Sequence, residues 1–205
     1  MIELKNICKS FGNRKIFDNY SVTIESGSFT IIIGESGCGK TTMLDMIGDI
    51  EKPDSGDIVV DGNSLAVLPQ RIYFRDYVGF LFQNFALIEN RTVRENLNII
   101  RKSNRTDITI EEGLRRVGLL EVADKKVYCL SGGEQQRVAL ARLMIKRCSL
   151  VLADEPTGSL DEKNGRIVMD QLHVLNEEGR TVIMVTHDRK WLSEATQVIE
   201  LSKFH

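Results

Sequence analysis

The chain has 205 residues, of which 42% are hydrophobic and 27% charged, a composition that excludes a disordered or fibrous protein. Its 27 Lys and Arg against 29 Asp and Glu give a formal charge of -2, so no net basic field exists and nucleic acid is not an expected partner. No apolar run approaches the roughly 18 residues that cross a bilayer, and the N-terminus lacks a secretory signal pattern, so we expect a cytosolic chain.

Short stretches rich in β-branched residues recur along the chain, and several of them are continuous apolar runs separated by helical segments. This alternation predicts an α/β core with a mostly parallel sheet covered on both faces. Ligands of such folds bind at the carboxyl ends of the strands. The strand-like stretches are residues 2–7, 29–33, 57–60, 78–82, 150–153, 181–186 and 198–201.

The strand pattern disappears after residue 83, and helical stretches follow at 92–102, 109–117 and 131–147. We therefore expect a single domain over 1–205, with a core formed by 1–83 and 147–205 and an inserted helical subdomain at 84–146. A further helix is expected at about 161–178. It carries a core-facing stripe at helical spacing and ends before a glycine. The stripe is Val168, Leu172 and Leu175.

Residues 34–41, with the sequence GESGCGKT, fit the phosphate-loop pattern G-x-x-x-x-G-K-[ST] between a predicted strand and a helical pattern. Glycines let backbone N–H groups point at phosphate oxygens, and the following helix adds its positive dipole end. Lys40 would reach the β- and γ-phosphates, and the Thr41 hydroxyl would bind Mg²⁺. Cys38 is either an oxidisable thiol or, as we favour, a small residue that fits the loop. The predicted nucleotide site comprises Gly34, Glu35, Ser36, Gly37, Cys38, Gly39, Lys40, Thr41 and Thr42.

A second glycine-rich element, LSGGEQQR at 130–137, opens another helical stretch. Ser131 and Glu134 have the spacing of a capping box, so one interpretation is simply a helix start. Glycines are poor helix formers, however, and inside a helix each costs about 0.8 to 1 kcal/mol relative to Ala. Gly132 and Gly133 beside a serine therefore favour a second surface that contacts an anionic ligand.

Polar residues also follow three of the predicted strands. Asp154 and Glu155 follow 150–153 and would lie at the ligand edge of the sheet. Taken alone, they could equally be a solvated acidic turn. Gln83 and His187 follow 78–82 and 181–186, and each by itself is an ordinary residue at the end of a strand.

Together and in this order, the phosphate loop, LSGGEQQR, LVLADEP at 150–156, SLD at 159–161 and THD at 186–188 resemble the ATP-binding subunit of an ABC transporter. The resemblance covers essentially the whole chain. It implies a P-loop NTPase (RecA-like) core with a small antiparallel β subdomain and an inserted helical subdomain. It also implies ATP and Mg²⁺ as cofactors, an integral membrane permease as partner and a place on the inner face of the cell membrane.

The resemblance further implies a dimer of two copies that meet head to tail. Each ATP would lie between the phosphate loop of one copy and the second glycine-rich element of the other. The contacting residues would be Ser131, Gly132, Gly133 and Glu134.

Individual roles follow from the same resemblance. Asp154 would hold Mg²⁺ through its water shell, and Gln83 would sense the metal and the attacking water. Glu155 would polarise that water, and His187 would contact the γ-phosphate. Phe11 falls where the family places an aromatic ring that stacks on adenine, and the alternative is a core phenylalanine.

The subgroup is indicated by shorter segments. EQQR at 134–137 and ADEPTGSLD at 153–161 are similar to ATPases of macrolide-exporter, lipoprotein-releasing and cell-division systems, and FQNFALI at 82–88 resembles the bacteriocin-export branch. We therefore expect ATP hydrolysis that powers export of a peptide, antibiotic or lipid-type substrate. The alternative is an ATP-gated signalling ATPase whose non-transporting membrane partner activates a cell-envelope hydrolase or sensor.

Overall fold

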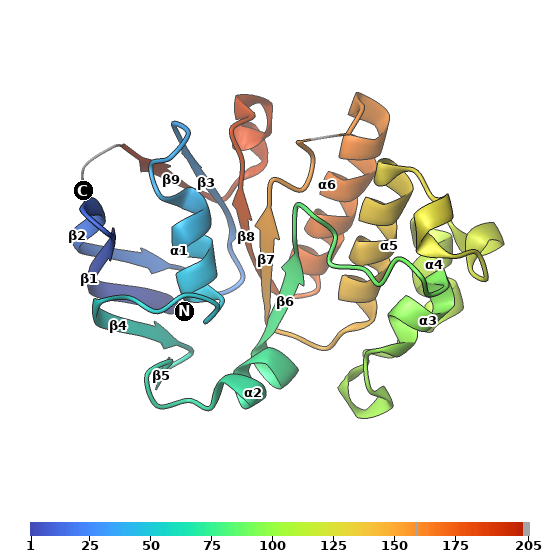
Figure 1. Cartoon of the computed structure of the whole chain (residues 1–205), viewed down its shortest axis with the longest axis horizontal. Helices are drawn as coiled ribbons and strands as arrows, with labels where there is room; N and C mark the ends of the chain where they lie inside the picture. The colour runs from blue at the N-terminus through green and yellow to red at the C-terminus, as the bar shows by residue number, and fades with distance from the viewer. Residues whose placement is uncertain (159, 203–205) are drawn as a thin grey trace.

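The structure, a computed structural model, describes residues 1–158 and 160–202 (Figure 1). A parallel sheet occupies the middle of the molecule, between a smaller sheet and a group of helices. Its strand order is β6-β7-β8-β3-β9, and every neighbouring pair runs parallel, as the sequence predicted. The strands are β3 (Phe29–Gly34), β6 (Val78–Leu81), β7 (Leu150–Asp154), β8 (Thr181–Val185) and β9 (Gln197–Leu201).

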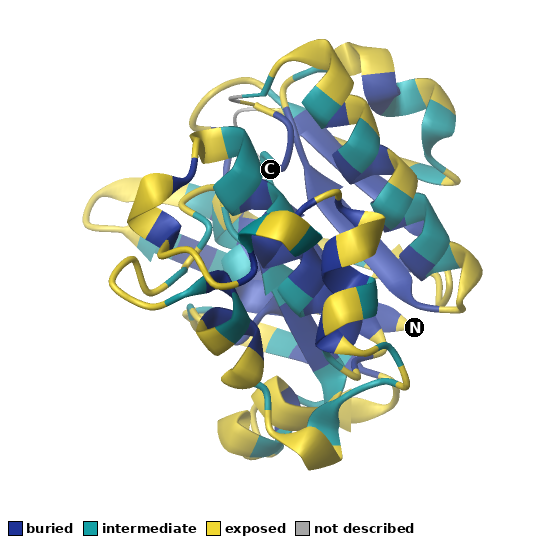
Figure 2. Cartoon of the chain, turned by 90° about the vertical axis from the view of Figure 1, so that its right-hand side faces the viewer, coloured by how far each residue is buried: buried dark blue, intermediate teal, exposed yellow. Residues whose placement is uncertain are grey.

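Helices flank this sheet. Each helix on one side buries the face that it turns toward the sheet and exposes its opposite face (Figure 2). The helices predicted at 92–102, 109–117, 131–147 and about 161–178 are present, and two of them end two or more residues earlier than expected, at Asn98 and Ile145. A short helix with a π-helical turn at Tyr73–Tyr77 was not predicted. The helices are α1 (Lys40–Ile47), α2 (Gln70–Ile72), α3 (Val93–Asn98), α4 (Ile110–Arg116), α5 (Gly132–Ile145) and α6 (Glu162–Glu177).

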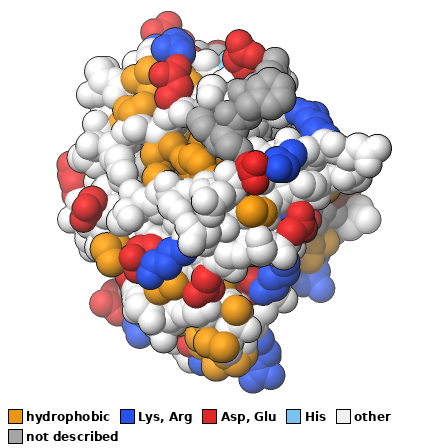
Figure 3. Space-filling view, turned by 90° about the vertical axis from the view of Figure 1, so that its left-hand side faces the viewer, with side chains coloured by type: hydrophobic (Ala, Val, Ile, Leu, Met, Phe, Trp, Pro, Cys, Tyr) orange, Lys and Arg blue, Asp and Glu red, His pale blue; other side chains and the backbone are white. Residues whose placement is uncertain are grey.

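A separate antiparallel sheet of order β2-β1-β4-β5 lies beside α1. The stretches predicted at 2–7 and 57–60 belong to it and not to the parallel sheet, and its other two strands were not predicted. Figure 3 shows charges of both signs intermixed over this side of the molecule. The strands are β1 (Ile2–Phe11), β2 (Arg14–Ile24), β4 (Ser55–Val60) and β5 (Asn63–Ser64).

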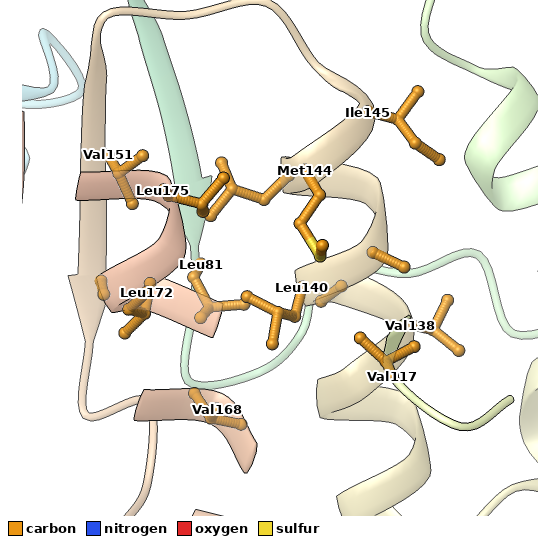
Figure 4. Packing of buried hydrophobic residues seen from close by; sticks show 14 of the residues in the cluster. Leu81, Val117, Val138, Leu140, Met144, Ile145, Val151, Val168, Leu172 and Leu175 are labelled. Atoms are coloured by element: carbon orange, nitrogen blue, oxygen red, sulfur yellow. The ribbon is translucent and has the colours of Figure 1, made fainter. Parts of the chain in front are cut away.

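Two hydrophobic clusters lie on the two faces of the parallel sheet. In β3, Ile31 belongs to the cluster with α5 and α6, whereas its neighbour Ile32 belongs to the cluster with α1 and the antiparallel sheet. Alternation of this kind follows from the two-residue period of a strand. The stripe predicted on α6 is fully buried against α5 and β7 (Figure 4). Burying one such aliphatic side chain contributes about 1.5 to 3 kcal/mol.

Candidate active site

The phosphate loop runs from the end of β3 to the start of α1, at the carboxyl edge of the parallel sheet. Its glycines are required by the surrounding chain. Gly39 has φ of 103°, and a Cβ there would lie 2.6 Å from Ile16 Cγ2 and 2.9 Å from Phe17 Cζ. A Cβ on Gly34 would lie 2.2 Å from the carbonyl oxygen of Leu201. No larger residue fits either position without displacing a strand.

Lys40 lies under this loop with its ammonium group enclosed. The Nζ atom donates hydrogen bonds to the carbonyl oxygens of Gly34 at 2.8 Å and Glu35 at 2.9 Å, and the residue is only 9% exposed. Within residues 1–158 and 160–202, no carboxylate forms an ion pair with it. A buried cation held by carbonyl dipoles alone is a favourable site for an anion such as phosphate.

A pocket of about 330 Å³ opens above the loop. Phe11 lines it with a ring that is 49% exposed, so this residue is not a core phenylalanine. Lys9 lies below the ring with Nζ 5.1 Å from the centroid, and it is itself fixed by hydrogen bonds to Glu51 at 2.7 Å and Asp54 at 3.3 Å. The ring therefore presents one flat face to the pocket region. The other lining residues are Arg14, Ile16, Ser36, Gly37, Gly39, Lys40, Thr41, Thr42 and Glu155.

Negative charge gathers beside Thr41. Its hydroxyl lies 3.4 Å from Asp154 Oδ1, at the end of β7. Partial burial, followed by the charge of Glu155, raises the pKa of Asp154, and burial, followed by the charge of Asp154, raises the pKa of Asp45. Carboxylates that repel one another in this way favour a bound cation.

The oxygen donors at this position fit Mg²⁺. In the described part of the chain, no group of three or more His, Cys, Asp or Glu could hold a metal ion. Mg²⁺, however, is usually bound through one or two carboxylates together with waters and substrate phosphates. Thr41 and Asp154 supply hard oxygen ligands of that kind beside the phosphate loop.

Glu155 follows β7 in a left-handed conformation with φ of 44°. Its N–H donates to the carbonyl oxygen of Val185 at 2.9 Å, which fixes the backbone against β8. Its carboxylate lies with both oxygens 3.0 Å from His187 Nδ1, and with Oε2 3.3 Å from the hydroxyl of Thr186. Two residues predicted separately thus meet here, and Thr186 joins them although the sequence analysis did not identify it.

The second glycine-rich element begins α5. Ser131 is the N-cap and forms a complete capping box with Glu134, and the hydrogen bond from the Ser131 N–H lowers the pKa of the Glu134 carboxyl. At Gly132 and Gly133 an added Cβ would make only ordinary contacts, with its nearest neighbours at 4.0 Å and 3.6 Å. The fold of the single chain therefore does not require glycine at either position.

The two glycine-rich helix starts are not brought together within one copy. None of the residues 131–134 lines the pocket at the phosphate loop. Figure 1 shows α1 and α5 on opposite sides of β8 and β7. Gln83, predicted to sense the metal, is exposed and does not line the pocket either.

The segment after Gln83 is held by helix α5. Phe85 and Ala86 both have positive φ, at 62° and 46°. Arg142 donates to the carbonyl oxygens of these two residues, at 2.9 Å and 2.5 Å. Burial lowers the pKa of Arg142, whose charge is compensated by backbone carbonyls.

The remaining motif, SLD, is described only in part. Ser159 lies outside the described residues, and Asp161 is the N-cap of α6, where its carboxylate accepts the N–H of Asn164 at 2.8 Å. Sequence reasoning missed Asp45, Arg14 and Ile16 at the site. Asp45 stands four residues after Thr41 on α1, a helical spacing from which it could have been found.

Comparison with known proteins identifies the family of the chain. Residues 17–158 match the family described as ABC transporter. The chain belongs to this family and is an ATPase domain of it, with the P-loop NTPase fold. It is 41% identical over 209 residues to the macrolide export ATP-binding/permease protein MacB of Campylobacter jejuni, covering 98% of this chain and 33% of the relative. The chain thus spans about a third of the length of that relative.

Shorter relatives are covered almost completely. The uncharacterized ABC transporter ATP-binding protein MJ1508 of Methanocaldococcus jannaschii is 37% identical over 213 residues, covering 98% of this chain and 95% of the relative. The dimeric structure of MJ0796, a bacterial ABC transporter cassette, is 37% identical with a TM-score of 0.88, covering 99% of this chain and 95% of that chain. A post-hydrolysis structure of MJ0796 bound to ADP and Pi is 36% identical with a TM-score of 0.85, covering 98% and 94%.

Proposed function

We propose that two copies of this chain enclose ATP between the phosphate loop of one and the start of α5 of the other, and hydrolyse it to drive a membrane permease. The observation that supports this proposal most directly is the pair of glycines after Ser131, which have no positive φ and where an added Cβ would make only ordinary contacts. Since their own chain does not require them, a ligand or partner outside it does. The dimeric structure described for MJ0796 supports this arrangement.

The chemistry follows from the residues already placed. Lys40 and the loop amides bind the β- and γ-phosphates, and Phe11 offers its ring to the base. Thr41 and Asp154 would hold Mg²⁺, with Gln83 joining them in the closed dimer, and the metal neutralises charge on the phosphates. Glu155 orients the attacking water as its general base, and His187 contacts the γ-phosphate.

The membrane partner is supported by an apolar groove of about 460 Å³ next to Gln83. Ile50 and Ile99, each 47% exposed, and Phe74, 36% exposed, contribute to it. Such a groove fits the apolar face of a helix from another protein. Among the residues described, no helix has both the length and the apolar character to span a bilayer. We place the chain in the cytoplasm, bound peripherally at the inner face of the membrane.

For the exported substrate, we infer only a class of molecule. The 41% identity to a macrolide export protein supports export of an antibiotic, peptide or lipid-type molecule. Co-purification of the chain with its membrane subunit, followed by identification of that subunit, tests this part of the proposal. A partner that binds or activates an envelope hydrolase instead would contradict export.

The deciding experiment on the site compares Glu155→Gln with Lys40→Ala. We expect the first variant to lose turnover by about a thousandfold and to retain ATP-dependent dimerisation, measured by size-exclusion chromatography with light scattering. The second should lose nucleotide affinity itself. Retained turnover in Glu155→Gln would remove this residue from catalysis, and a variant that stays monomeric with saturating ATP would contradict the dimer.

A further inference from the structure

Thr186 is a polar residue in the core that none of the assigned roles uses. It follows β8 directly and is 0% exposed. Its backbone N–H donates to the carbonyl oxygen of Ile32 at 3.2 Å, so strand β3 fixes its position. A buried hydroxyl at the carboxyl edge of the sheet has to be satisfied by neighbouring polar groups.

The direction of its hydrogen bonds can be assigned. The Thr186 hydroxyl oxygen accepts the backbone N–H of Asp188 at 3.1 Å. The hydroxyl proton is thereby left for the other neighbour, Glu155 Oε2, at 3.3 Å. A carboxylate oxygen accepts and does not donate, so the bond runs from Thr186 to Glu155.

The carboxylate of Glu155 has two donors of different character. His187 is an exposed side chain, at 70%, and it can turn away toward a phosphate. Thr186 cannot turn away, because it is enclosed and its backbone is fixed on both sides. A hydrogen bond to a charged group contributes more than a neutral one, and more still where water is excluded.

We infer that the Thr186 hydroxyl is a positioning residue that holds the Glu155 carboxylate in place for the attacking water when His187 leaves it for the nucleotide. This inference rests on the proposed function and deepens it. The left-handed backbone of Glu155 fixes the direction in which its side chain leaves the main chain. The hydrogen bond from Thr186 then fixes the orientation of its carboxylate.

The test uses three variants of the full chain. Thr186→Val keeps the shape of the side chain and removes the hydroxyl, and Thr186→Ser restores it. Thr30→Val is the matched control, because Thr30 is also 0% exposed and, among the described residues, its hydroxyl bonds Ser28 and Gln197, away from the site. Steady-state ATPase rates, ATP affinity and melting temperature are measured for each.

We expect Thr186→Val to lower kcat about tenfold or more with KM and ATP-dependent dimerisation unchanged, and Thr186→Ser to recover most of the rate. Thr30→Val should melt earlier, as Thr186→Val does, but keep its kcat. The inference is wrong if Thr186→Val retains wild-type kcat, or if Thr186→Ser fails to restore it while folding normally. If Glu155→Gln is inactive in the same assay, either result refutes only the role of Thr186 and leaves the proposed function intact.

Discussion

The two glycine-rich helix starts of this chain have similar sequences and different physical origins. In the phosphate loop, Gly39 is left-handed and any side chain there would collide with Ile16 and Phe17. At the start of α5, Gly132 and Gly133 have no positive φ, and an added Cβ would make only ordinary contacts there. The first loop therefore requires its glycine because of its own chain, whereas the glycines of the second are not required by the single chain and fit the proposed contact with a partner copy.

Because of this difference, substitutions in the two elements should change different properties, namely the stability of the chain and its assembly with a second copy. A substitution of a glycine in the first loop should lower both the stability of the fold and the affinity for nucleotide. At Gly132 or Gly133, an alanine adds a good helix former and should affect mainly what docks at this helix start.

The largest effect is expected for Gly39→Ala. The left-handed backbone and the contact with Phe17 together should destabilise the chain by about 3 kcal/mol and remove nucleotide binding. Chemical denaturation and binding of a fluorescent ATP analogue measure both. An alanine variant with normal affinity would show that the loop can relax. In that case the chain does not require glycine at position 39.

Gly133→Ala should give the opposite pattern. We expect the isolated chain to be as stable as the wild type or up to about 1 kcal/mol more stable, with nucleotide affinity unchanged. Turnover should fall about a hundredfold if the proposed dimer is correct, because the added methyl group, 3.6 Å from Asn164 and Leu160, would narrow the space between α5 and the partner's phosphate. Wild-type turnover at high protein concentration would contradict the assignment of this surface.

Ser131→Ala tests whether the N-cap residue of α5 contributes to turnover as well as to stability. Loss of the N-cap should cost about 1 kcal/mol, seen as a lower urea midpoint without a change in slope. Thr109→Ala, which removes the N-cap of α4, is the matched control. Both variants should lose similar stability, but only Ser131→Ala should lose turnover as well.

The smallest effect concerns pH. The Ser131 N–H lowers the pKa of Glu134 below its ordinary value of 4.5 in the folded chain. Its stabilising contribution is therefore complete above about pH 4.5 and is lost as the pH falls through the lowered value. The melting-temperature difference between wild type and Glu134→Gln should shrink over that window. The difference for Glu121→Gln, at an exposed position, serves as the baseline. A Glu134 difference that stays constant as the pH falls would contradict the bond.

The parts of the fold that could be predicted are those with strong local patterns. Strands β3, β7 and β8 are continuous apolar runs, and their bounds were predicted to within one residue. Strand β2 was missed because Asp18 and Asn19 interrupt its pattern, with Asn19 at φ of 56°, and because its pairing with β1 shifts register three times. Such irregular strands are defined by their partner and not by their own sequence.

The same distinction applies to the site. Residues 34–42 are contiguous, so one motif predicts them together. The contact between Glu155 and Thr186 instead depends on the register of two parallel strands, in which Asp154 pairs with Val185. That register is set by packing across the whole sheet, which a motif does not contain.

The position of β3 has a consequence for synthesis of the chain on the ribosome. Its two sheet neighbours, β8 and β9, lie far along the chain from it, and the carbonyl oxygen of Leu201 in β9 would lie 2.2 Å from a Cβ on Gly34. The apolar strand β3 must therefore stay unpaired during synthesis until β8 and β9 have been made. Truncated products that lack β9 should neither bind nucleotide nor escape chaperones.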